Sequence, residues 1–157
     1  MNSQTVKTVL FVCLGNICRS PTGEGVLQSL VDEQGLSDSI KIDSAGTAGY
    51  HIGARADERM REHASRRGYD LQSRARKLVP TDLETFDLVI AMDRENFDDI
   101  NRLHGDPSAD VKLLSEYLDD SWPSDVPDPY YGGEDGFEYV LDMIEAAAPE
   151  ILNQLAE

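Results

Sequence analysis

Short runs of apolar residues alternate along the chain with segments in which apolar positions recur at helical spacing. The apolar runs cover residues 8–13, 40–43, 88–92 and 111–114, and the first of them, TVLFVC, is almost entirely apolar. Such a run is typical of a strand that is covered on both faces. Strands that alternate with helices in this way favour a parallel sheet with helices packed against it. The pattern therefore predicts an α/β fold with a four-stranded parallel sheet flanked by helices.

The helices are predicted from apolar positions that recur every three or four residues. They cover a segment from about Ser20 to Gly35, residues 57–67, residues 94–104 and a C-terminal segment from about residue 136. Pro149 is expected to kink or interrupt the last of them. Residues 115–134 contain three prolines and a Gly-Gly pair, and they are too long for a plain connector. Loops of this length are usually functional or disordered.

The composition is that of one globular domain. The chain has 157 residues, of which 40% are hydrophobic, so it can bury a sizeable core, and we predict a single domain over residues 1–157. The first residues lack an apolar run of signal-peptide length, and no stretch approaches the ~20 apolar residues of a membrane span. We therefore expect a cytoplasmic protein that does not associate with membranes.

The charged residues are numerous and unevenly distributed. The net charge of −16 argues against nucleic acid as a partner, because a protein that binds nucleic acid needs many cations along the phosphate backbone. Eight of the fourteen lysines and arginines fall between residues 55 and 77, which we call the basic segment, whereas residues 118–135 hold six acids and no base. A run of charge is most often a solvated face, but the basic segment is also a candidate docking surface.

The segment VCLGNICRSP, residues 12–21, holds both cysteines of the chain. It follows the first predicted strand and opens the first predicted helix, and ligands of such sheets bind beyond the carboxyl ends of the strands. Backbone N–H groups and the positive end of the helix dipole can converge there on an anion. Gly15 and Asn16 allow backbone conformations that other residues resist. The sequence therefore predicts a phosphate-binding loop directly after the first strand.

Three side chains of this loop have the chemistry for phosphoryl transfer. The thiol of Cys13 would lie at the focus of the anion site, where the thiolate, a strong nucleophile, is favoured. The planar fork of Arg19 can hold two oxygens of a phosphoryl group and stabilise the charge that develops during attack. Ser20 can donate a hydrogen bond to the sulfur and help it leave as a thiolate. The alternatives are an inert buried cysteine and a surface arginine at the start of a helix.

Cys18 has two interpretations. If the loop curls around its ligand, the Cα atoms of Cys13 and Cys18 can come within about 7 Å, which is the range a disulfide requires. Cys18 would then be a resolving thiol that protects Cys13 from irreversible oxidation. Because the cytosol disfavours structural disulfides, two cysteines so close together indicate a reactive or redox pair. The other interpretation of Cys18 is a plain packing role.

The motif VCLGNICRSP together with DPYY at residues 128–131 resembles the low-molecular-weight protein tyrosine phosphatases. Further matches are SAGT at residues 44–47 and FDLVIAMDREN ending at Asn96, and the resemblance spans essentially the whole chain. It implies an enzyme that hydrolyses phosphotyrosine in proteins through a phosphocysteine intermediate, without a metal or another cofactor. It further implies phosphotyrosine-containing proteins as substrates, and we expect the protein to be a monomer.

The resemblance also implies roles for individual residues. Cys13 is the nucleophile, Arg19 clamps the phosphate, Ser20 is the thiolate partner and Asp128 is the general acid. The residues that bind the substrate phosphate come from the loop itself: Leu14, Gly15, Asn16, Ile17, Cys18 and Ser20. Asn16 and Ser44 are expected to form a hydrogen bond that holds the loop open, although a serine at the end of a strand can also be a simple turn residue.

The chemistry of the leaving group supports the role of Asp128 independently. A phenolate is expelled more easily when it is protonated, and a carboxylic acid on a loop can supply that proton. The resulting carboxylate can then act as a base that activates water against the phosphocysteine. The alternative is a turn aspartate, because Asp-Pro is common in turns.

Three tyrosines are candidates for the walls of a deep crevice that reaches phosphotyrosine but disfavours the shorter phosphoserine. Tyr130 and Tyr131 would form one wall and Tyr50 the opposite one, although aromatic residues are more often part of a core. Adjacent tyrosines in an extended loop alternate faces, so one of Tyr130 and Tyr131 is expected to contact the substrate. Many relatives carry tryptophan where this chain has Tyr50, and some carry histidine at Ser73, which bears on substrate preference and on the bracing of the loop.

Two other functions fit parts of the pattern. An arsenate reductase has the same fold and loop. This chain has no cysteine after Cys18, so as an arsenate reductase it would need an external thiol. A phosphate-binding or redox-sensing module without turnover would not need Asp128. The three histidines have no spacing that is typical of metal ligands. Asp93, at the end of a predicted strand, has either a helix-capping or a functional role.

Overall fold

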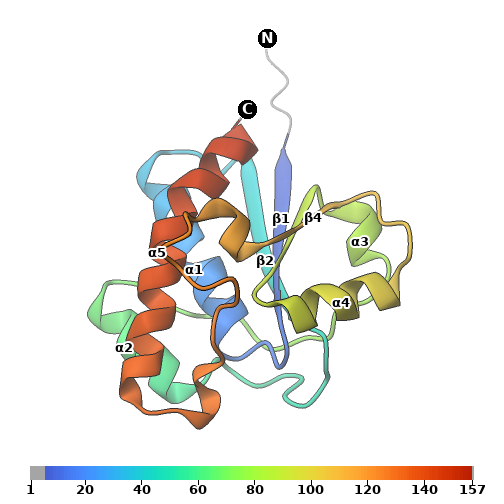
Figure 1. Ribbon diagram of the computed structural model, residues 1–157. Helices are drawn as coiled ribbons and strands as arrows, with labels where there is room; N and C mark the ends of the chain where they lie inside the picture. Colours follow the sequence, from blue (N-terminus) through green and yellow to red (C-terminus); the bar gives the residue numbers. More distant parts are fainter. Residues whose placement is uncertain (1–5, 157) are drawn as a thin grey trace.

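The computed structural model describes residues 6–156, except for the side chains of residues 131 and 134. Four parallel strands form one sheet in the order β2-β1-β3-β4 (Figure 1). Their bounds are Lys7–Cys13 for β1, Ile40–Gly46 for β2, Leu88–Ala91 for β3 and Asp110–Leu113 for β4. The predicted four-stranded parallel sheet is confirmed. Strand β2 is three residues longer than predicted because Ser44, Ala45 and Gly46 pair with the last three residues of β1.

Five α-helices accompany the sheet in the described part of the chain. They are α1 (Arg19–Glu33), α2 (Glu58–Arg66), the one-turn α3 (Asp82–Thr85), α4 (Arg94–Leu103) and α5 (Glu134–Ala156). Helix α5 continues through Pro149, so Pro149 does not interrupt the helix, and the alternative, a kink, stays a prediction. Proline removes one backbone hydrogen bond from a helix. That loss is outweighed by packing, because a long apolar face of α5 is buried from Phe137 to Leu155 and packs against α1.

Residues of β1 alternate between two hydrophobic cores, one on each face of the sheet. Val9, Phe11 and Cys13 belong to the core beneath α1, α2 and α5, whereas Leu10 and Val12 belong to the core beneath α3 and α4. Figure 1 shows these two groups of helices on opposite sides of the strands. All five side chains are at most 2% exposed. A central strand covered on both faces explains the nearly continuous apolar run that opens the chain.

The long segment before α5 is ordered around two short 3-10 helices, η1 (Leu114–Tyr117) and η2 (Pro129–Tyr131). Between them, the N–H of Val126 donates to the carbonyl of Met92 at the end of β3, over 2.9 Å. Val126 is 1% exposed, so the segment is anchored to the sheet just before Asp128.

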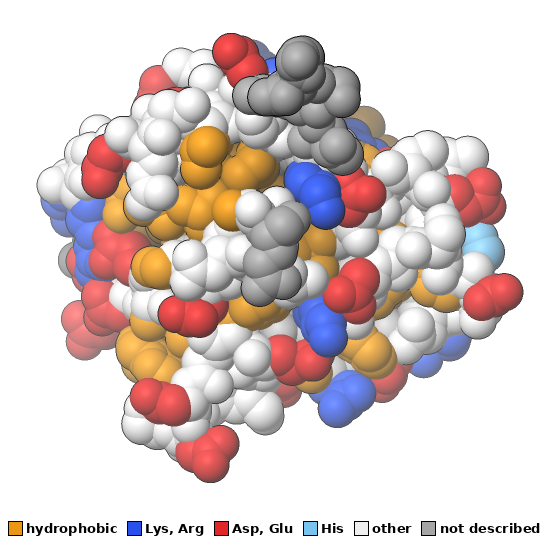
Figure 2. Space-filling view, turned by 90° about the horizontal axis from the view of Figure 1, so that it is seen from above, with side chains coloured by type: hydrophobic (Ala, Val, Ile, Leu, Met, Phe, Trp, Pro, Cys, Tyr) orange, Lys and Arg blue, Asp and Glu red, His pale blue; other side chains and the backbone are white. Residues whose placement is uncertain are grey.

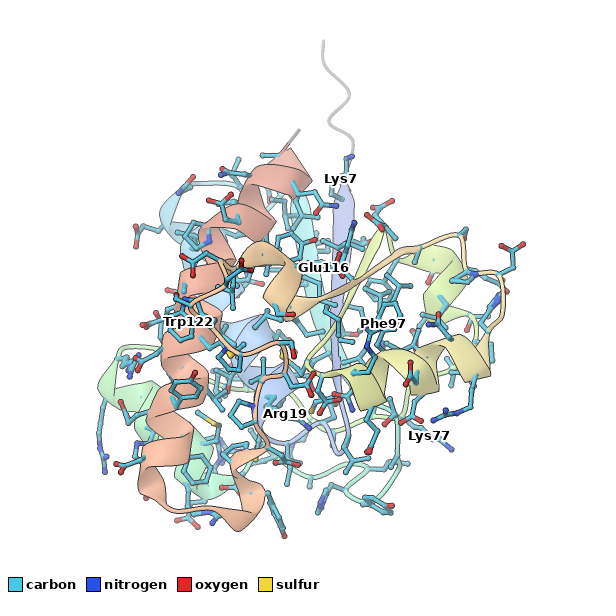
Figure 3. The ribbon with its side chains drawn as sticks, in the orientation of Figure 1. Lys7, Arg19, Lys77, Phe97, Glu116 and Trp122 are labelled. Atoms are coloured by element: carbon cyan, nitrogen blue, oxygen red, sulfur yellow. The ribbon has the colours of Figure 1, made fainter. Side chains whose placement is uncertain are left out.

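The two ends of the sheet differ in character. Figure 3 places Lys7, where β1 begins, at the opposite end of the molecule from Arg19 and Lys77. Figure 2 shows the end at which the strands begin, where hydrophobic side chains gather toward α5 with acidic side chains scattered around them. The carboxyl end carries the strand-to-helix loops. Among residues 6–156, no helix combines the length and the apolar character that a membrane crossing requires.

Candidate active site

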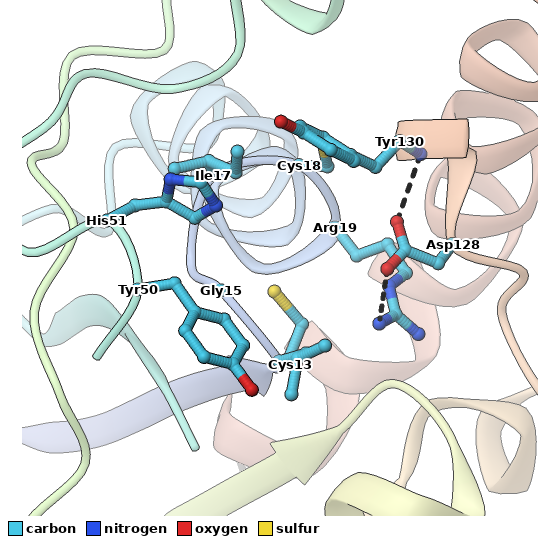
Figure 4. A pocket seen from close by; sticks show the side chains of 10 residues that line it. Cys13, Gly15, Ile17, Cys18, Arg19, Tyr50, His51, Asp128 and Tyr130 are labelled. Atoms are coloured by element: carbon cyan, nitrogen blue, oxygen red, sulfur yellow. Dashed lines mark hydrogen bonds and ion pairs between the residues drawn. The ribbon is translucent and has the colours of Figure 1, made fainter. Parts of the chain in front are cut away.

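The loop between Cys13 and Arg19 turns tightly at the carboxyl end of β1 (Figure 4). Asn16 has a φ of 58°, in the left-handed region that asparagine tolerates better than most residues, as predicted. Gly46, the last residue of β2, lies directly behind the loop. A Cβ atom at this position would stand 2.8 Å from the carbonyl oxygen of Leu14, so only glycine allows the loop to pack so closely against β2.

A chain of hydrogen bonds leads to the sulfur of Cys13. The backbone N–H of Arg76 donates to Asn16 Oδ1 at 3.0 Å, which orients the amide so that Asn16 Nδ2 donates to Ser20 Oγ at 2.8 Å. Ser20 Oγ lies 3.0 Å from Cys13 Sγ and 3.5 Å from the carbonyl of Ala45, so its hydroxyl proton can be donated to either of them. The backbone N–H of Ser20 also points at the sulfur, at 3.5 Å. These donors stabilise a thiolate at Cys13.

Arg19 lies beside the thiol and is 2% exposed. Its Nη1 donates to Asp93 Oδ2 at 2.6 Å and to the carbonyl of Val126 at 3.0 Å, while Nη2 stands 3.6 Å from Asp128 Oδ2. Burial alone would lower the pKa of Arg19, but the charges of Cys13, Asp93 and Asp128 outweigh it and raise the pKa. The guanidinium therefore stays charged and is held in one orientation.

Asp93 both caps a helix and pairs with Arg19. Its Oδ1 accepts from the N–H of Asn96 at 2.8 Å and caps α4, while its Oδ2 accepts from Arg19. The two oxygens of one carboxylate thus join the start of α4 to Arg19, at the end of the loop that begins at Cys13. An asparagine, with a single oxygen, could not serve both partners.

Asp128 lies at the mouth of the pocket opposite the thiol (Figure 4). Its Oδ1 accepts from the N–H of Tyr130 at 3.0 Å, which leaves Oδ2 directed toward Arg19. Its side chain is 34% exposed, so the carboxyl group is open to both substrate and water. The anchor at Val126 and a hydrogen bond from the N–H of Arg94 to Asp125 Oδ1, at 3.0 Å, hold the preceding residues in place.

One pocket gathers most of the predicted site residues from three separate segments. Its lining consists of Cys13, Leu14, Gly15, Ile17, Cys18, Arg19, Tyr50, His51, Asp128 and Tyr130. Figure 4 shows Tyr50 and Tyr130 on opposite sides of it. Tyr50 is 74% exposed and Tyr130 36% exposed, so both rings stand on the rim rather than in the core. The side chain of Tyr131 lies outside the described part of the structure.

The two cysteines differ in environment although both are free thiols. Cys13 has the donors described above. Cys18 is 4% exposed, and burial, together with the negative charge of Asp57, raises the pKa of its thiol far above the usual range. Cys18 therefore stays protonated at neutral pH and is not itself a nucleophile in this conformation.

One expected contact is absent. Ser44 does not bond to Asn16; its hydroxyl instead donates to Glu24 Oε1 on α1, at 2.6 Å. The side chain of Asn16 is occupied by Ser20 and by the backbone of Arg76. Asn16 and Ser20 are 1% and 0% exposed, and they brace the loop from behind rather than line the pocket.

Sequence reasoning missed two residues that shape the pocket. The ring of His51 lies between those of Tyr50 and Tyr130, with centroid distances of 6.4 and 6.1 Å. Arg59 on α2 places its guanidinium 5.5 Å from the ring centroid of Tyr130 and donates through Nη2 to the Tyr130 carbonyl at 3.1 Å. Proximity to Tyr50 was the one available signal for His51, whereas nothing in the sequence marks Arg59.

The chain is similar over nearly its whole length to proteins of one family. The family model of low molecular weight phosphotyrosine protein phosphatase matches residues 8–157. The low molecular weight protein-tyrosine-phosphatase YfkJ of Bacillus subtilis is 42% identical over 147 residues, which are 92% of this chain and 93% of the relative. The low molecular weight phosphotyrosine protein phosphatase of Homo sapiens is 41% identical over 146 residues, which are 91% and 92% of the two chains.

The fold is shared as well. A crystal structure of YfkJ from Bacillus subtilis matches with a TM-score of 0.92 and 39% identity, covering 99% of this chain and 98% of that one. A protein tyrosine phosphatase from Entamoeba histolytica matches with a TM-score of 0.90 and 38% identity, covering 96% and 97%. This chain therefore belongs to the low molecular weight phosphotyrosine protein phosphatase family.

Proposed function

We propose that this protein hydrolyses phosphotyrosine in phosphoproteins, with Cys13 as the nucleophile, Arg19 as the phosphate clamp and Asp128 as the general acid and base. One observation carries the assignment. A thiol contacted by the hydroxyl and the N–H of Ser20, a fixed guanidinium and an open carboxyl group meet in a single pocket, although Asp128 lies far along the chain from Cys13 and Arg19. Each group supplies a different requirement of phosphoryl transfer through cysteine.

The first step transfers the phosphoryl group to sulfur. The Cys13 thiolate attacks phosphorus, the S–P bond forms and the P–O bond to the tyrosine breaks. Asp128 gives its proton to the departing phenolate oxygen, which leaves as neutral tyrosine. Asp93 and Val126 both engage Nη1 of Arg19, so Nε and Nη2 remain for the phosphoryl oxygens. Backbone N–H groups of the loop complete the anion site.

The second step hydrolyses the phosphocysteine. The Asp128 carboxylate, now deprotonated, takes a proton from a water molecule as its oxygen attacks phosphorus. The S–P bond breaks, phosphate leaves and the thiolate returns. The hydroxyl of Ser20 stabilises the sulfur as its charge reappears, over the 3.0 Å contact described above. Asp128 is again protonated at the end of the cycle, so the proton balance closes.

Selection of phosphotyrosine follows from the aromatic rim. A phosphate bound by the loop places the substrate ring between Tyr50 and Tyr130, with His51 between these walls. The short side chain of phosphoserine would have to bring its backbone below this rim. Which of Tyr130 and Tyr131 contacts the substrate is not tested, so contact by Tyr131 stays a prediction. We also propose that the protein acts as a cytoplasmic monomer, independent of nucleic acid and membrane surfaces, consistent with its net charge of −16.

Cys18 is proposed to protect Cys13 during oxidation. Both thiols line the same pocket. Peroxide would oxidise Cys13 to a sulfenic acid, and the thiol of Cys18, giving up its proton to the departing hydroxide once the loop rearranges, would then form a disulfide with Cys13 and release water. A thiol can reduce this disulfide again. A Cys18→Ser variant should then lose activity irreversibly after peroxide treatment, whereas the parent should recover when dithiothreitol is added. Equal recovery would rule out the protective role.

The experiment that tests the function is steady-state hydrolysis of a phosphotyrosine peptide and a matched phosphoserine peptide, with a chelator present. The parent, Cys13→Ser and the matched cysteine control Cys18→Ser are compared. We expect chelator-resistant, tyrosine-selective turnover by the parent and by Cys18→Ser, and none by Cys13→Ser. No turnover by the reduced parent would contradict the proposal and direct attention to arsenate reduction with added thiol or to anion binding, which the relatives do not favour.

A further inference from the structure

A second groove, of about 460 Å³, opens beside the catalytic pocket. The two depressions share Leu14 of the catalytic loop and Tyr50 of the rim, so the ring of Tyr50 stands between them. We propose that this groove binds an acidic side chain of the substrate protein close in sequence to the phosphotyrosine. The inference rests on the proposed function and adds a substrate preference to it.

The charges of the groove favour an anion. Its lining contains three titratable side chains with a charge at neutral pH, namely Lys77, Asp99 and Arg102. Arg102 is paired with Asp99 one turn before it on α4, so these two charges largely cancel. Lys77 is exposed, and no carboxylate oxygen among the described side chains lies within 4.0 Å of its ammonium group. The groove therefore carries one uncompensated positive charge in a strongly acidic protein.

Lys77 differs in this respect from three arginines of the basic segment. Arg59 is paired with Asp57, Arg67 with three carboxylates of α5, and Arg76 with Asp43 and Asp82. Those arginines connect elements of the fold and are not available to a partner. Lys77 makes no such connection and lies at the same end of the molecule as Arg19 (Figure 3). Part of the basic segment is thus structural, and Lys77 is free to meet a substrate.

The position of Tyr50 explains why a residue near the phosphotyrosine would reach the groove. A substrate whose phosphate is bound at Cys13 leaves the pocket across the rim, and Tyr50 forms a wall of both depressions. A carboxylate that enters the groove lies next to Lys77 and can draw Arg102 away from Asp99. Leu78 and Leu103 line the same groove and exclude part of the water around that charge. Partly exposed ion pairs of this kind contribute roughly two- to five-fold each in affinity.

The test compares phosphotyrosine peptides that carry a single glutamate, or glutamine in its place, at each of three positions on either side of the phosphotyrosine. The ratio of kcat/KM for the glutamate and glutamine peptides is measured for the parent, Lys77→Gln and Asp99→Asn. Lys41→Gln, an exposed lysine on β2, is the matched control. An aryl phosphate without flanking residues reports the proposed function separately.

For the parent we expect kcat/KM to be roughly three- to ten-fold higher with the glutamate than with the glutamine peptide, at positions on only one side of the phosphotyrosine. This ratio should be smaller at high salt. Lys77→Gln should bring this ratio close to one, Lys41→Gln should leave it unchanged, and Asp99→Asn should raise it because Arg102 is released. A ratio of one at every position in the parent, or a preference that survives Lys77→Gln, would overturn the inference.

Binding separates failure of this inference from failure of the proposed function. The Kd values of the same peptides are measured for the single variant Cys13→Ser and for the double variant that also carries Lys77→Gln. A glutamate preference that depends on Lys77 would support the groove even if the parent hydrolysed neither peptide nor aryl phosphate. Identical Kd values for the glutamate and glutamine peptides would refute the groove even if turnover were normal.

Discussion

Arg19 Nη1 lies 2.6 Å from Asp93 Oδ2, which joins the start of α1 to the start of α4. The contact follows from the pairing of β1 with β3, since Val12 and Ala91 are partners near the carboxyl ends of these strands. Parallel neighbours deliver the residues that follow them to one edge of the sheet. Asp93 thereby fixes the orientation of the arginine that is proposed to clamp the phosphate.

Replacing Asp93 separates its two roles. In Asp93→Asn the single oxygen can still cap α4, because asparagine is a good N-cap, but Arg19 loses its charged partner. We expect kcat/KM on an aryl phosphate to fall about ten-fold or more in both Asp93→Asn and Asp93→Ala. Only the alanine variant should also lose about 1 kcal/mol of unfolding free energy through the missing cap. Parent-like kinetics in Asp93→Asn would show that Arg19 needs no such positioning.

Removal of the general acid should depend on the leaving group. Asp128→Ala is expected to lower kcat/KM on a phosphotyrosine peptide by roughly 100-fold or more, because the phenolate must then leave unprotonated. An activated aryl phosphate, whose phenol is much more acidic, should lose far less in kcat/KM. The measurement is a series of aryl phosphates of decreasing phenol pKa, and an equal loss across the series would argue against Asp128 as the acid.

Arg59 is predicted to position the segment that carries Asp128 and Tyr130. Its guanidinium also lies 4.9 Å from the ring centroid of Phe137, so it bridges α2, η2 and the start of α5. Arg59→Gln should raise KM for a phosphotyrosine peptide several-fold, with a smaller effect on kcat. Arg66→Gln, an exposed position on the same helix, is the control and should match the parent. A change in both variants would indicate a general effect of charge rather than positioning.

Glu24 makes the stability of the fold depend on pH. Burial raises the pKa of this carboxyl group above its ordinary value of 4.5, against the opposing effect of the hydrogen bond from Ser44. The pKa of Glu24 is therefore higher in the folded than in the unfolded protein. Its contribution to the free energy of unfolding is fully present below pH 4.5, where the carboxyl group is protonated, and is lost as the pH rises through the folded pKa. Glu24→Gln should therefore have a higher Tm than the parent at pH 7, with the difference shrinking toward pH 4.5.

The control for this prediction is Glu33→Gln, at an exposed position on the same helix. It should leave the pH dependence of Tm unchanged. If the Tm values of the parent and of Glu24→Gln differed by the same amount at every pH, burial of Glu24 would not make the stability of the fold depend on pH.

Much of the fold was predictable because its signals are local. The apolar run of β1 and the helical spacing after it define the central unit, and alternation of strands with helices then leaves few topologies. The end of β2 was not predictable, since its last residues are strand only through pairing with β1. The continuity of α5 through Pro149 depends on packing against α1, which the sequence of α5 does not contain.

The candidate site likewise has a part that is local in the sequence, which could be predicted, and a part that depends on distant residues, which could not. Cys13, Arg19 and Ser20 lie within one short motif, so their chemistry could be assigned from spacing. The partners of Arg19 lie 74 and 107 residues away, at Asp93 and Val126, and a backbone carbonyl leaves no mark in a sequence. The predicted bond between Asn16 and Ser44 failed for a related reason. Glu24 reaches Ser44 from α1, and the rotation of that helix against β2 cannot be read from spacing.

The most direct test of the account is to trap the phosphoryl group on the enzyme. Asp128→Ala should form the intermediate readily from an activated aryl phosphate but hydrolyse it slowly, because water lacks its base. We predict that rapid quenching and mass spectrometry of proteolytic fragments will find one phosphate on Cys13 in this variant, and none when Cys13→Ser is added. Release of phosphate without a phosphoenzyme, or a phosphate on any other residue, would contradict catalysis through Cys13.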